Sequence, residues 1–538
     1  MKTKKLLAFL LIAVLLMSVF GCTPAAEPDD QDVANTANPT ATEGQPTEVV
    51  PTGKLTMAYA YDISGIASWD IRDITDHVSL SCVYEPLFVL DREGNPVGYL
   101  AKELIPNVDD LSYEVVLRED VTFSDGSKLD ADALLWYFEY YKANSPTSST
   151  YFGSVDHFEK TGDYSVKICL SQWDSQIPFG LAYTAGMPYS KAAFEENGEE
   201  WAIAHAVGTG PYVMGDFVAN DYRIYELNEN YWNKEETPAF EQIEWIVIAD
   251  ELTATSALQT GEIDGYLGAS FSMLETLDMN GFQSLNSPTM QVQSLVFASD
   301  VEGSPLSDLR VRQAISYAID SESICEVITC GMGGVSTQSA IPGTAFYNED
   351  VIGYEYDVEK AKQLLAEAGY ADGFETKIVT ESAGIYPQLA TMVQANLREI
   401  GIEAEVKLDE RSLWFEEMYG IDEGMIIGRN SFDFDLCNNL KSNYSKDAIG
   451  GVGLLNQCKI HPDDLDAAIQ NSISATSMEE MYAYEKEAQR LLVDEYCIMY
   501  PVFTNCRTYI SLTPEINDNG CFGTTTGAFN YNLLRIAG

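Results

Sequence analysis

The chain has 538 residues, of which 46% are hydrophobic and 11% aromatic, enough apolar material for about three packed domains. Its formal net charge of −52 makes nucleic acid and anionic lipid head groups poor partners. The charge says little about a ligand, because most acidic side chains are expected on solvated helix faces.

The N-terminal segment is typical of a secretion signal. Lysines precede an apolar run from Leu6 to Phe20, which is too short to span a bilayer comfortably. The stretch Val19-Phe20-Gly21-Cys22 resembles a bacterial lipobox, although Phe20 is bulkier than that pattern usually allows. We therefore expect residues 1–21 to be removed and Cys22 to be lipidated. An ordinary signal peptide with an incidental cysteine is the alternative.

A tether is predicted between this cysteine and the globular part of the chain. Residues 23–52 are rich in Pro, Thr, Ala, Asn and acidic residues, with too little hydrophobicity to bury a core. A flexible linker of this kind would hold the body off a membrane surface. No later apolar run approaches the roughly 18 residues of a membrane span, so we expect attachment by lipid alone.

Three segments show the alternation of a half-buried strand. In 54–62, Leu55, Met57, Tyr59 and Tyr61 alternate with smaller residues. Residues 164–170 and 402–408 repeat the pattern, the latter with Glu403, Glu405 and Lys407 predicted to face outward.

Helices alternate irregularly with these strands. Apolar stripes predict helices over 311–319 and 358–368, the second ending at Gly369 as a glycine just past the helix end. Ser477-Met478-Glu479-Glu480 fits a capping box that opens a third helix. The sequence therefore predicts a mixed α/β body, without a repeat that would indicate a solenoid or propeller.

Cysteine and histidine usage favours neither a metal site nor a cofactor. Without Cys22, nine cysteines remain, an odd number that cannot all pair within one chain. Cys325 and Cys330, or Cys497 and Cys506, are close in sequence, but spacing alone does not establish a disulfide. The lack of any Cys-x-x-Cys and the presence of only four histidines argue against a structural zinc site.

Four separated segments carry recognisable motifs. They are Val83-Tyr84-Glu85-Pro86-Leu87-Phe88; 117–132, with Leu117-Arg118 and Phe123-Ser124-Asp125-Gly126; 208–264, with Gly208-Thr209-Gly210-Pro211-Tyr212 and Gly261-Glu262-Ile263-Asp264; and 310–370, with Arg310-Val311-Arg312-Gln313-Ala314 and Ala366-Glu367-Ala368-Gly369-Tyr370. In this order they resemble the family 5 solute-binding proteins of bacterial ABC importers, the oligopeptide, dipeptide and nickel-binding family. Their residues are typical of scaffold rather than catalysis. Asp125-Gly126 predicts a hairpin turn, and Gly261 a helix end.

The resemblance implies a periplasmic-binding-protein-like α/β fold, with two mixed α/β lobes around a cleft, hinge crossings and an extra domain on the first lobe. Domain I would comprise 53–88, 207–296 and 500–538. Domain II would comprise 89–206, and domain III 297–499. A ligand that contacts both lobes would stabilise a closed state that a membrane permease recognises.

The resemblance also indicates where a ligand would lie. Peptide-binding members pair an aspartate of domain III with the ligand's amino end, within a tryptophan and Tyr-x-x-Pro pattern. This chain has 428–435 at that place, so the equivalent is either Asp433 or Asp435, and the missing tryptophan and proline put a peptide ligand in doubt.

Five further residues complete the predicted site. Arg429 would bind a ligand carboxylate or pair with an acid of the protein itself, and Asn430 lies beside it. Trp414 would form a pocket wall or plain core. Tyr151 matches a domain II loop that contributes an aromatic residue, and His77, near a ligand-facing loop of domain I, is a pH-sensitive contact or a surface residue.

The expected function is capture of a short peptide by a monomeric, lipid-anchored protein on the outer face of the cell membrane or in the periplasm. It would deliver the peptide to a transporter of two membrane subunits and two ATPases. The alternatives are another solute, such as a nickel chelate or an oligosaccharide, and a ligand-presenting sensor. A secreted hydrolase is disfavoured because the sequence has no Gly-x-Ser-x-Gly, His-Glu-x-x-His or P-loop motif.

Overall fold

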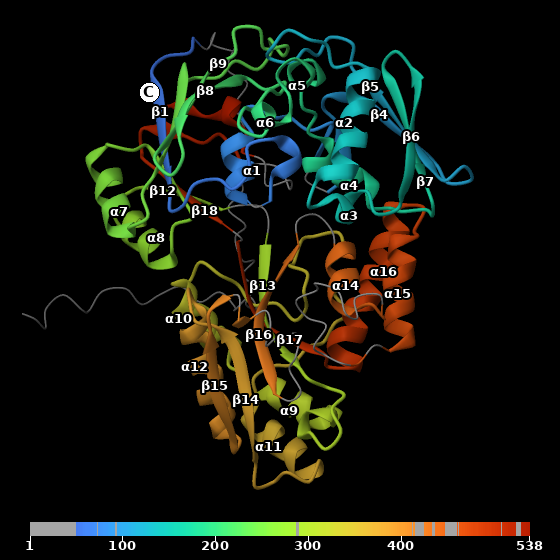
Figure 1. Ribbon diagram of the computed structural model, residues 1–538. Helices are drawn as coiled ribbons and strands as arrows, with labels where there is room; N and C mark the ends of the chain where they lie inside the picture. The colour runs from blue at the N-terminus through green and yellow to red at the C-terminus, as the bar shows by residue number, and fades with distance from the viewer. Residues whose placement is uncertain are drawn as a thin grey trace, which may run out of the picture. The chain divides into compact units, whose positions relative to one another are not determined.

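The computed structural model describes residues 50–537, apart from 73, 92–93, 287–289, 412, 415–423, 433–435, 447–459, 461, 507 and 523–528. Three main β-sheets organise these residues (Figure 1). In this part of the chain, no helix has the length and apolar character needed to cross a membrane.

The first sheet has seven strands. In spatial order they are β12 (Gln283–Asn286), β18 (Tyr509–Leu512), β11 (Gly265–Leu267), β1 (Lys54–Tyr59), β10 (Gln242–Val247), β9 (Tyr222–Leu227) and β8 (Tyr212–Val218). The strand predicted from residue 54 is present as β1, but it is buried on both faces. Thr56 and Ala58 are covered because helices α7 (Glu251–Thr260) and α8 (Phe271–Asp278) pack on their side of the sheet.

The second sheet has four antiparallel strands. Their order is β4 (Ala101–Asn107), β5 (Ser112–Leu117), β7 (Ser165–Leu170) and β6 (Val155–Gly162), and helix α2 (Ala131–Asn144) packs against β6 and β7. The predicted alternation in β7 is confirmed, since Val166, Ile168 and Leu170 are buried. The predicted turn is also present, because Gly126 has a φ of 86°.

The third sheet has five strands, with β13 between β16 and β17. The order is β15 (Ile402–Asp409), β14 (Phe374–Glu381), β16 (Met425–Phe432), β13 (Met290–Phe297) and β17 (Met499–Cys506). In β15 the predicted alternation holds for Ile402 and Ala404, which are buried, but Leu408 at the end of this edge strand is exposed.

We call the parts of the chain that form and cover the first, second and third sheets the first, second and third regions. The predicted helices of the third region are confirmed. They are α9 (Leu309–Ala318), α11 (Val358–Glu367) and α16 (Met478–Arg490). Gly369 has a φ of 92°, as expected just past a helix end. Ser477 Oγ accepts a hydrogen bond from the Glu480 amide at 3.2 Å, but the Glu480 carboxylate accepts one from the Thr476 amide instead of returning to Ser477.

The remaining helices and short strands connect or cover these sheets. They are α1 (Ile74–Leu80), α3 (Ser148–Tyr151), α4 (Ile177–Leu181), α5 (Lys191–Asn197), α6 (Glu199–Ala202), α10 (Ser321–Thr329), α12 (Tyr386–Glu399), α14 (Cys437–Tyr444), α15 (Asp463–Ile473), β2 (Phe88–Leu90), β3 (Pro96–Gly98), β19 (Ile516–Asn517) and β20 (Arg535–Ile536).

Strand pairing differs from the predicted domain limits at two places. The prediction assigned 290–296 and 500–506 to domain I, whereas β13 and β17 pair with each other in the third sheet. The alternation of residues in a strand could not predict to which sheet it belongs, because a buried strand has the same sequence pattern in either sheet. The first two sheets share one apolar core, and the third sheet has cores of its own.

Candidate functional site

Two short chain crossings join the first and third sheets. One lies between β12, which ends at Asn286, and β13, which begins at Met290; the other lies between β17, ending at Cys506, and β18, beginning at Tyr509. The crossings are neighbours, because Asn286 pairs with Tyr509 in one sheet and Met290 with Cys506 in the other. Such short, adjacent connections are the form that a hinge between two lobes takes.

Arg429 lies on β16, beside these crossings, in a cluster with two other polar side chains. Its Nη1 donates to the Tyr386 hydroxyl at 2.8 Å and lies 3.4 Å from Glu381 Oε1. The Arg429 side chain is 23% exposed, whereas that of Glu381 is 8% exposed. Burial raises the pKa of Tyr386, and the nearby Arg429 charge opposes that rise. Arg429 thus has an acid of the protein as a neighbour and still reaches solvent.

Polar side chains continue from Arg429 across the next two strands. Gln293 on β13 pairs with Arg429 in the strand register, and its amide donates to Asn505 Oδ1 on β17 at 3.0 Å. The Asn505 amide donates to the Cys506 carbonyl at 2.7 Å. These bonds provide partners for two buried amide side chains, since Gln293 is 1% exposed and Asn505 7% exposed.

His77 and Tyr151 are brought together through a third aromatic residue. The His77 ring stacks on Tyr183 with centroids 4.6 Å apart, and the Tyr151 and Tyr183 rings lie 6.0 Å apart. His77 was expected at a ligand contact or at the surface, but it is only 1% exposed, within α1. His77 belongs to α1, beside the first sheet, whereas Tyr151 and Tyr183 belong to the part of the chain that forms the second sheet.

The other predicted site residues have different outcomes. Trp414 is buried, 2% exposed, which fits a place in a core or a closed pocket wall. Asn430 is part of β16, but its side chain lies outside the described residues, as do Asp433, Asp435 and Cys22.

Sequence reasoning missed Tyr386, Glu381 and Tyr183. Glu381 is the last residue of β14, and Tyr386 begins the helix α12 that comes next. Both therefore lie at the carboxyl end of a parallel strand, which is where ligands bind in α/β sheets. That position was the available signal for the first two. Tyr183 is one of 31 tyrosines, and nothing in its local sequence distinguishes it.

A second polar cluster, centred on Glu85, lies between the first two sheets. Glu85 is 5% exposed and accepts hydrogen bonds from Tyr231, Trp232, Thr209 and Tyr99 at 2.6, 2.9, 2.8 and 3.1 Å. Burial raises the pKa of Glu85 to about 7, against the effect of these donors. Four donors from the protein itself thus surround the Glu85 carboxyl.

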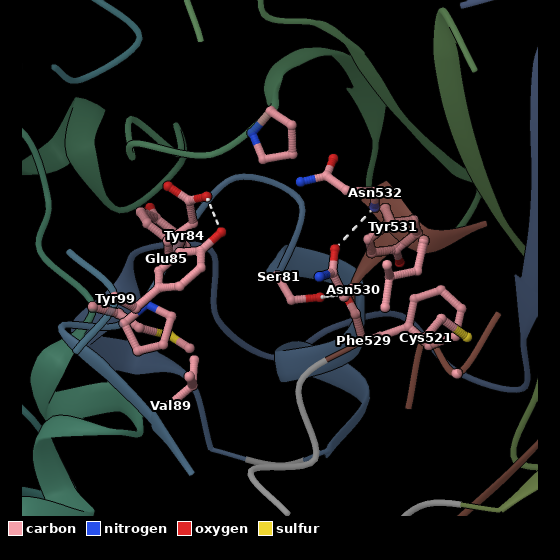
Figure 2. A pocket seen from close by; sticks show the side chains of 15 residues that line it. Ser81, Tyr84, Glu85, Val89, Tyr99, Cys521, Phe529, Asn530, Tyr531 and Asn532 are labelled. Carbon is pink, nitrogen blue, oxygen red and sulfur yellow. Dashed lines mark hydrogen bonds between the residues drawn. The ribbon is translucent and has the colours of Figure 1, made fainter. Parts of the chain in front are cut away.

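Glu85 also lines a cavity of about 100 Å³, in which Figure 2 shows the Tyr99 hydroxyl directed at the carboxylate. A larger cavity of about 620 Å³ lies in the third region, next to Asp320, Glu355 and Tyr500. Tyr500 is at the start of β17, whereas the crossing follows the other end of that strand. Of the predicted site residues whose side chains the structure describes, none lines either cavity.

The second region contacts the third directly at the helix pair α15–α16. Trp173 Nε1 donates to the Ala475 carbonyl at 2.7 Å, the Ser175 amide to the Ile473 carbonyl at 2.9 Å, and Ser175 Oγ to the Ser472 carbonyl at 3.0 Å. These acceptors belong to the C-terminal end of α15 and the turn after it, where carbonyls lack partners within the helix. These bonds join the second region to the third. They are separate from the crossings, which join the first region to the third.

Comparisons with known proteins agree on one family. The model of bacterial extracellular solute-binding proteins, family 5 (middle), matches residues 95–451. The glutathione-binding protein GsiB of Escherichia coli O1:K1 / APEC is 27% identical over 359 residues, covering 66% of this chain and 69% of that protein. Heme-binding protein A of Haemophilus influenzae is 28% identical over 415 residues, covering 71% and 74%.

Solved structures show the same fold. NikA from Brucella suis, in complex with Fe(III)-EDTA, has a TM-score of 0.80 at 22% identity, covering 90% of this chain and 100% of that one. DppA from Helicobacter pylori, in complex with the peptide STSA, has a TM-score of 0.71 at 22% identity, covering 90% and 98%. The predicted periplasmic-binding-protein-like fold is confirmed. The chain belongs to the bacterial extracellular solute-binding proteins of family 5.

Proposed function

We propose that this protein captures a short peptide between its two lobes and delivers it to a permease of two membrane subunits and two ATPases. Members of family 5 are extracytoplasmic binding proteins that carry small ligands to ABC permeases, and they are not enzymes. The observation that carries the peptide proposal is the Arg429 cluster beside the two crossings.

Arg429 would bind the carboxylate end of the ligand. Its guanidinium is oriented by Tyr386 and remains partly exposed, so a carboxylate can replace the long contact to Glu381 with a two-point hydrogen bond. Glutathione, heme, the STSA peptide and EDTA, which are named for the relatives above, all carry carboxylates. This shared group supports a carboxylate ligand more strongly than a sugar.

The other end of a peptide would be bound by residues adjoining β16. An aspartate, Asp433 or Asp435, would neutralise the ligand's ammonium group, since a buried ammonium without a carboxylate is costly. Asn430 and Trp414 would contribute to the same lobe. Tyr151 would act from the opposite one, with the buried His77 supporting it through Tyr183. We also propose the three domains expected from the sequence, except that β13 and β17 belong to domain III because they pair with each other in the third sheet.

The test is calorimetry on the purified protein with di- to hexapeptides, glutathione, nickel chelates and oligosaccharides, each carboxylate ligand paired with its C-terminal amide where one exists. A peptide present at 100 times its dissociation constant should add about 2.7 kcal/mol to the unfolding free energy. Peptide amides should bind more weakly. Binding of a sugar alone would contradict the peptide proposal, and turnover of any compound would contradict a binding function.

We also propose that Cys22 carries the lipid that attaches the monomer to the membrane. Replacing Cys22 by serine should release the protein from the membrane fraction, whereas Cys330→Ser, at an exposed cysteine of the body, should leave it attached. Fractionation followed by mass spectrometry of the N-terminal peptide checks both. A membrane-bound C22S variant would show that another segment provides the anchor.

A further inference from the structure

Three side chains with metal-binding atoms meet on one face of the second sheet. His157 on β6 pairs with Cys169 on β7, and Glu159 is two residues further along β6. Residues two apart on a strand face the same side, and so does the residue opposite in register. The His157 nitrogen, Glu159 oxygen and Cys169 sulfur lie within 4.8 Å of one another.

A fourth residue orients the histidine. Asp156 Oδ2 lies 2.8 Å from His157 Nδ1, and Glu159 Oε1 lies 3.1 Å from Nε2. Neighbouring residues on a regular strand point to opposite faces, but the β6–β7 register shifts between Val155 and His157. A bulge of this kind lets Asp156 reach the histidine. A carboxylate on one ring nitrogen fixes the tautomer that leaves the other nitrogen for a metal.

The local charge also favours a cation. Asp156 and Glu159 place one carboxylate at each nitrogen of the His157 ring. Lys167, which pairs with Glu159 in the register, forms an ion pair with Asp110. Two carboxylates then remain beside the imidazole and the thiol.

We propose that this face binds a divalent transition-metal ion of the zinc type through His157 Nε2, the Glu159 carboxylate and Cys169 Sγ, with Asp156 as the positioning residue. One nitrogen, one oxygen and one sulfur ligand form a set that suits zinc and its neighbours better than magnesium or calcium. Three protein ligands leave a fourth position open to solvent. None of the residues proposed for the peptide site lies on β6 or β7, so this inference is independent of the peptide proposal.

Cobalt(II) titration of the full chain, without an affinity tag, tests the site, because a thiolate bound to cobalt gives a charge-transfer absorption. We expect this band to saturate at one equivalent and to be displaced by Zn²⁺. It should disappear in Cys169→Ser and His157→Ala, and Asp156→Asn should weaken binding by about 10- to 100-fold. The matched control is Cys330→Ser, since Cys330 is an exposed cysteine near carboxylates, on α10's C-terminal side in the third region rather than on the second sheet.

The site residues are on the surface, so the variants should melt within a few degrees of the parent without metal. If C169S keeps the band, if C330S loses it, or if no band forms, the proposal is wrong. A band that Arg429→Ala abolishes would place the metal at the ligand cleft and would equally overturn it. Failure of peptide binding would leave all of these readings unchanged.

Discussion

The junction between the first two regions differs in kind from the junction with the third. Residues of both the first and second sheets, such as Met57 and Val115, belong to one apolar cluster, and the four-donor site of Glu85 lies between them. Among described buried residues, the third region contributes only Ala475 and Met481 to that cluster. It is joined by two short crossings and a few bonds to backbone carbonyls.

This difference indicates which parts move together. A shared apolar core resists separation, because opening it would expose its whole buried area to water. Bonds to carbonyls at a helix end can be exchanged for bonds to water at small net cost. We therefore expect the first two regions to behave as one body and the third region to move against it.

The largest effect should come from removing the buried carboxyl of the rigid junction. Glu85→Ala leaves donors of Tyr231, Trp232 and Thr209 without an acceptor, and we expect a loss of about 4 kcal/mol in unfolding free energy near pH 5. Urea denaturation measures it. Glu119→Ala, at an exposed position, should change stability by about 0.5 kcal/mol or less. Equal losses in both variants would show that the junction is not tightly packed at Glu85.

The pH dependence of stability sharpens the same point. The pKa of folded Glu85 is about 7, above its ordinary 4.5, so between these values the folded protein holds a proton that the unfolded chain releases. This contribution to stability is complete below about pH 4.5, is lost as the pH rises through 7, and amounts to about 3 kcal/mol. Glu85→Gln keeps a neutral acceptor and should flatten this part of the profile. An unchanged profile would contradict the assigned pKa.

In the third region, which we expect to move, Arg429→Ala should weaken binding of a peptide ligand by about 30- to 100-fold, because a charge-assisted hydrogen bond is lost. The matched control is Arg398→Ala, because Arg398 is exposed and pairs with Glu403 on the surface. Calorimetry on both variants checks this. Undiminished binding by R429A would remove the carboxylate role.

The smallest effect is expected at the contact between the second and third regions. Trp173→Phe keeps an aromatic ring, although a smaller one, and loses the bond to the Ala475 carbonyl. This loss should shift the open–closed balance by about 1 kcal/mol towards the open form. Small-angle scattering without ligand should show a larger radius of gyration, whereas Trp136→Phe, in α2, should not. Expansion of both variants, or of neither, would show that this contact does not set the balance.

Much of the scaffold could be predicted from local sequence. The stripe over 311–319, the stop at Gly369 and the cap at Ser477 each depend on neighbouring residues, and each is present. Arg312, from one of the family-like segments, is a scaffold residue, since its guanidinium donates to carbonyls that include those of Cys497 and Leu306.

What could not be predicted depends on contacts between distant residues. The second face of β1 is buried because α7 and α8, about 200 residues later in the chain, pack on it. The small residues that alternate with Leu55 and Met57 are compatible with burial of that face. Arg429 contacts Tyr386, and His77 contacts Tyr183; in both pairs the two residues are at least 43 positions apart in the sequence. All eight described cysteines are free thiols, including the sequence-adjacent pairs that spacing left open.

The bonds between α15 and Trp173 and Ser175 have a consequence for transport. Each is worth about 0.5–1.5 kcal/mol net, so together they favour the arrangement in which the second and third regions touch, even without a ligand. Binding proteins without a ligand would then adopt the closed form often enough to reach the permease in that form. A transporter served by this protein would need a second check, at the permease itself, to avoid spending ATP on an empty delivery.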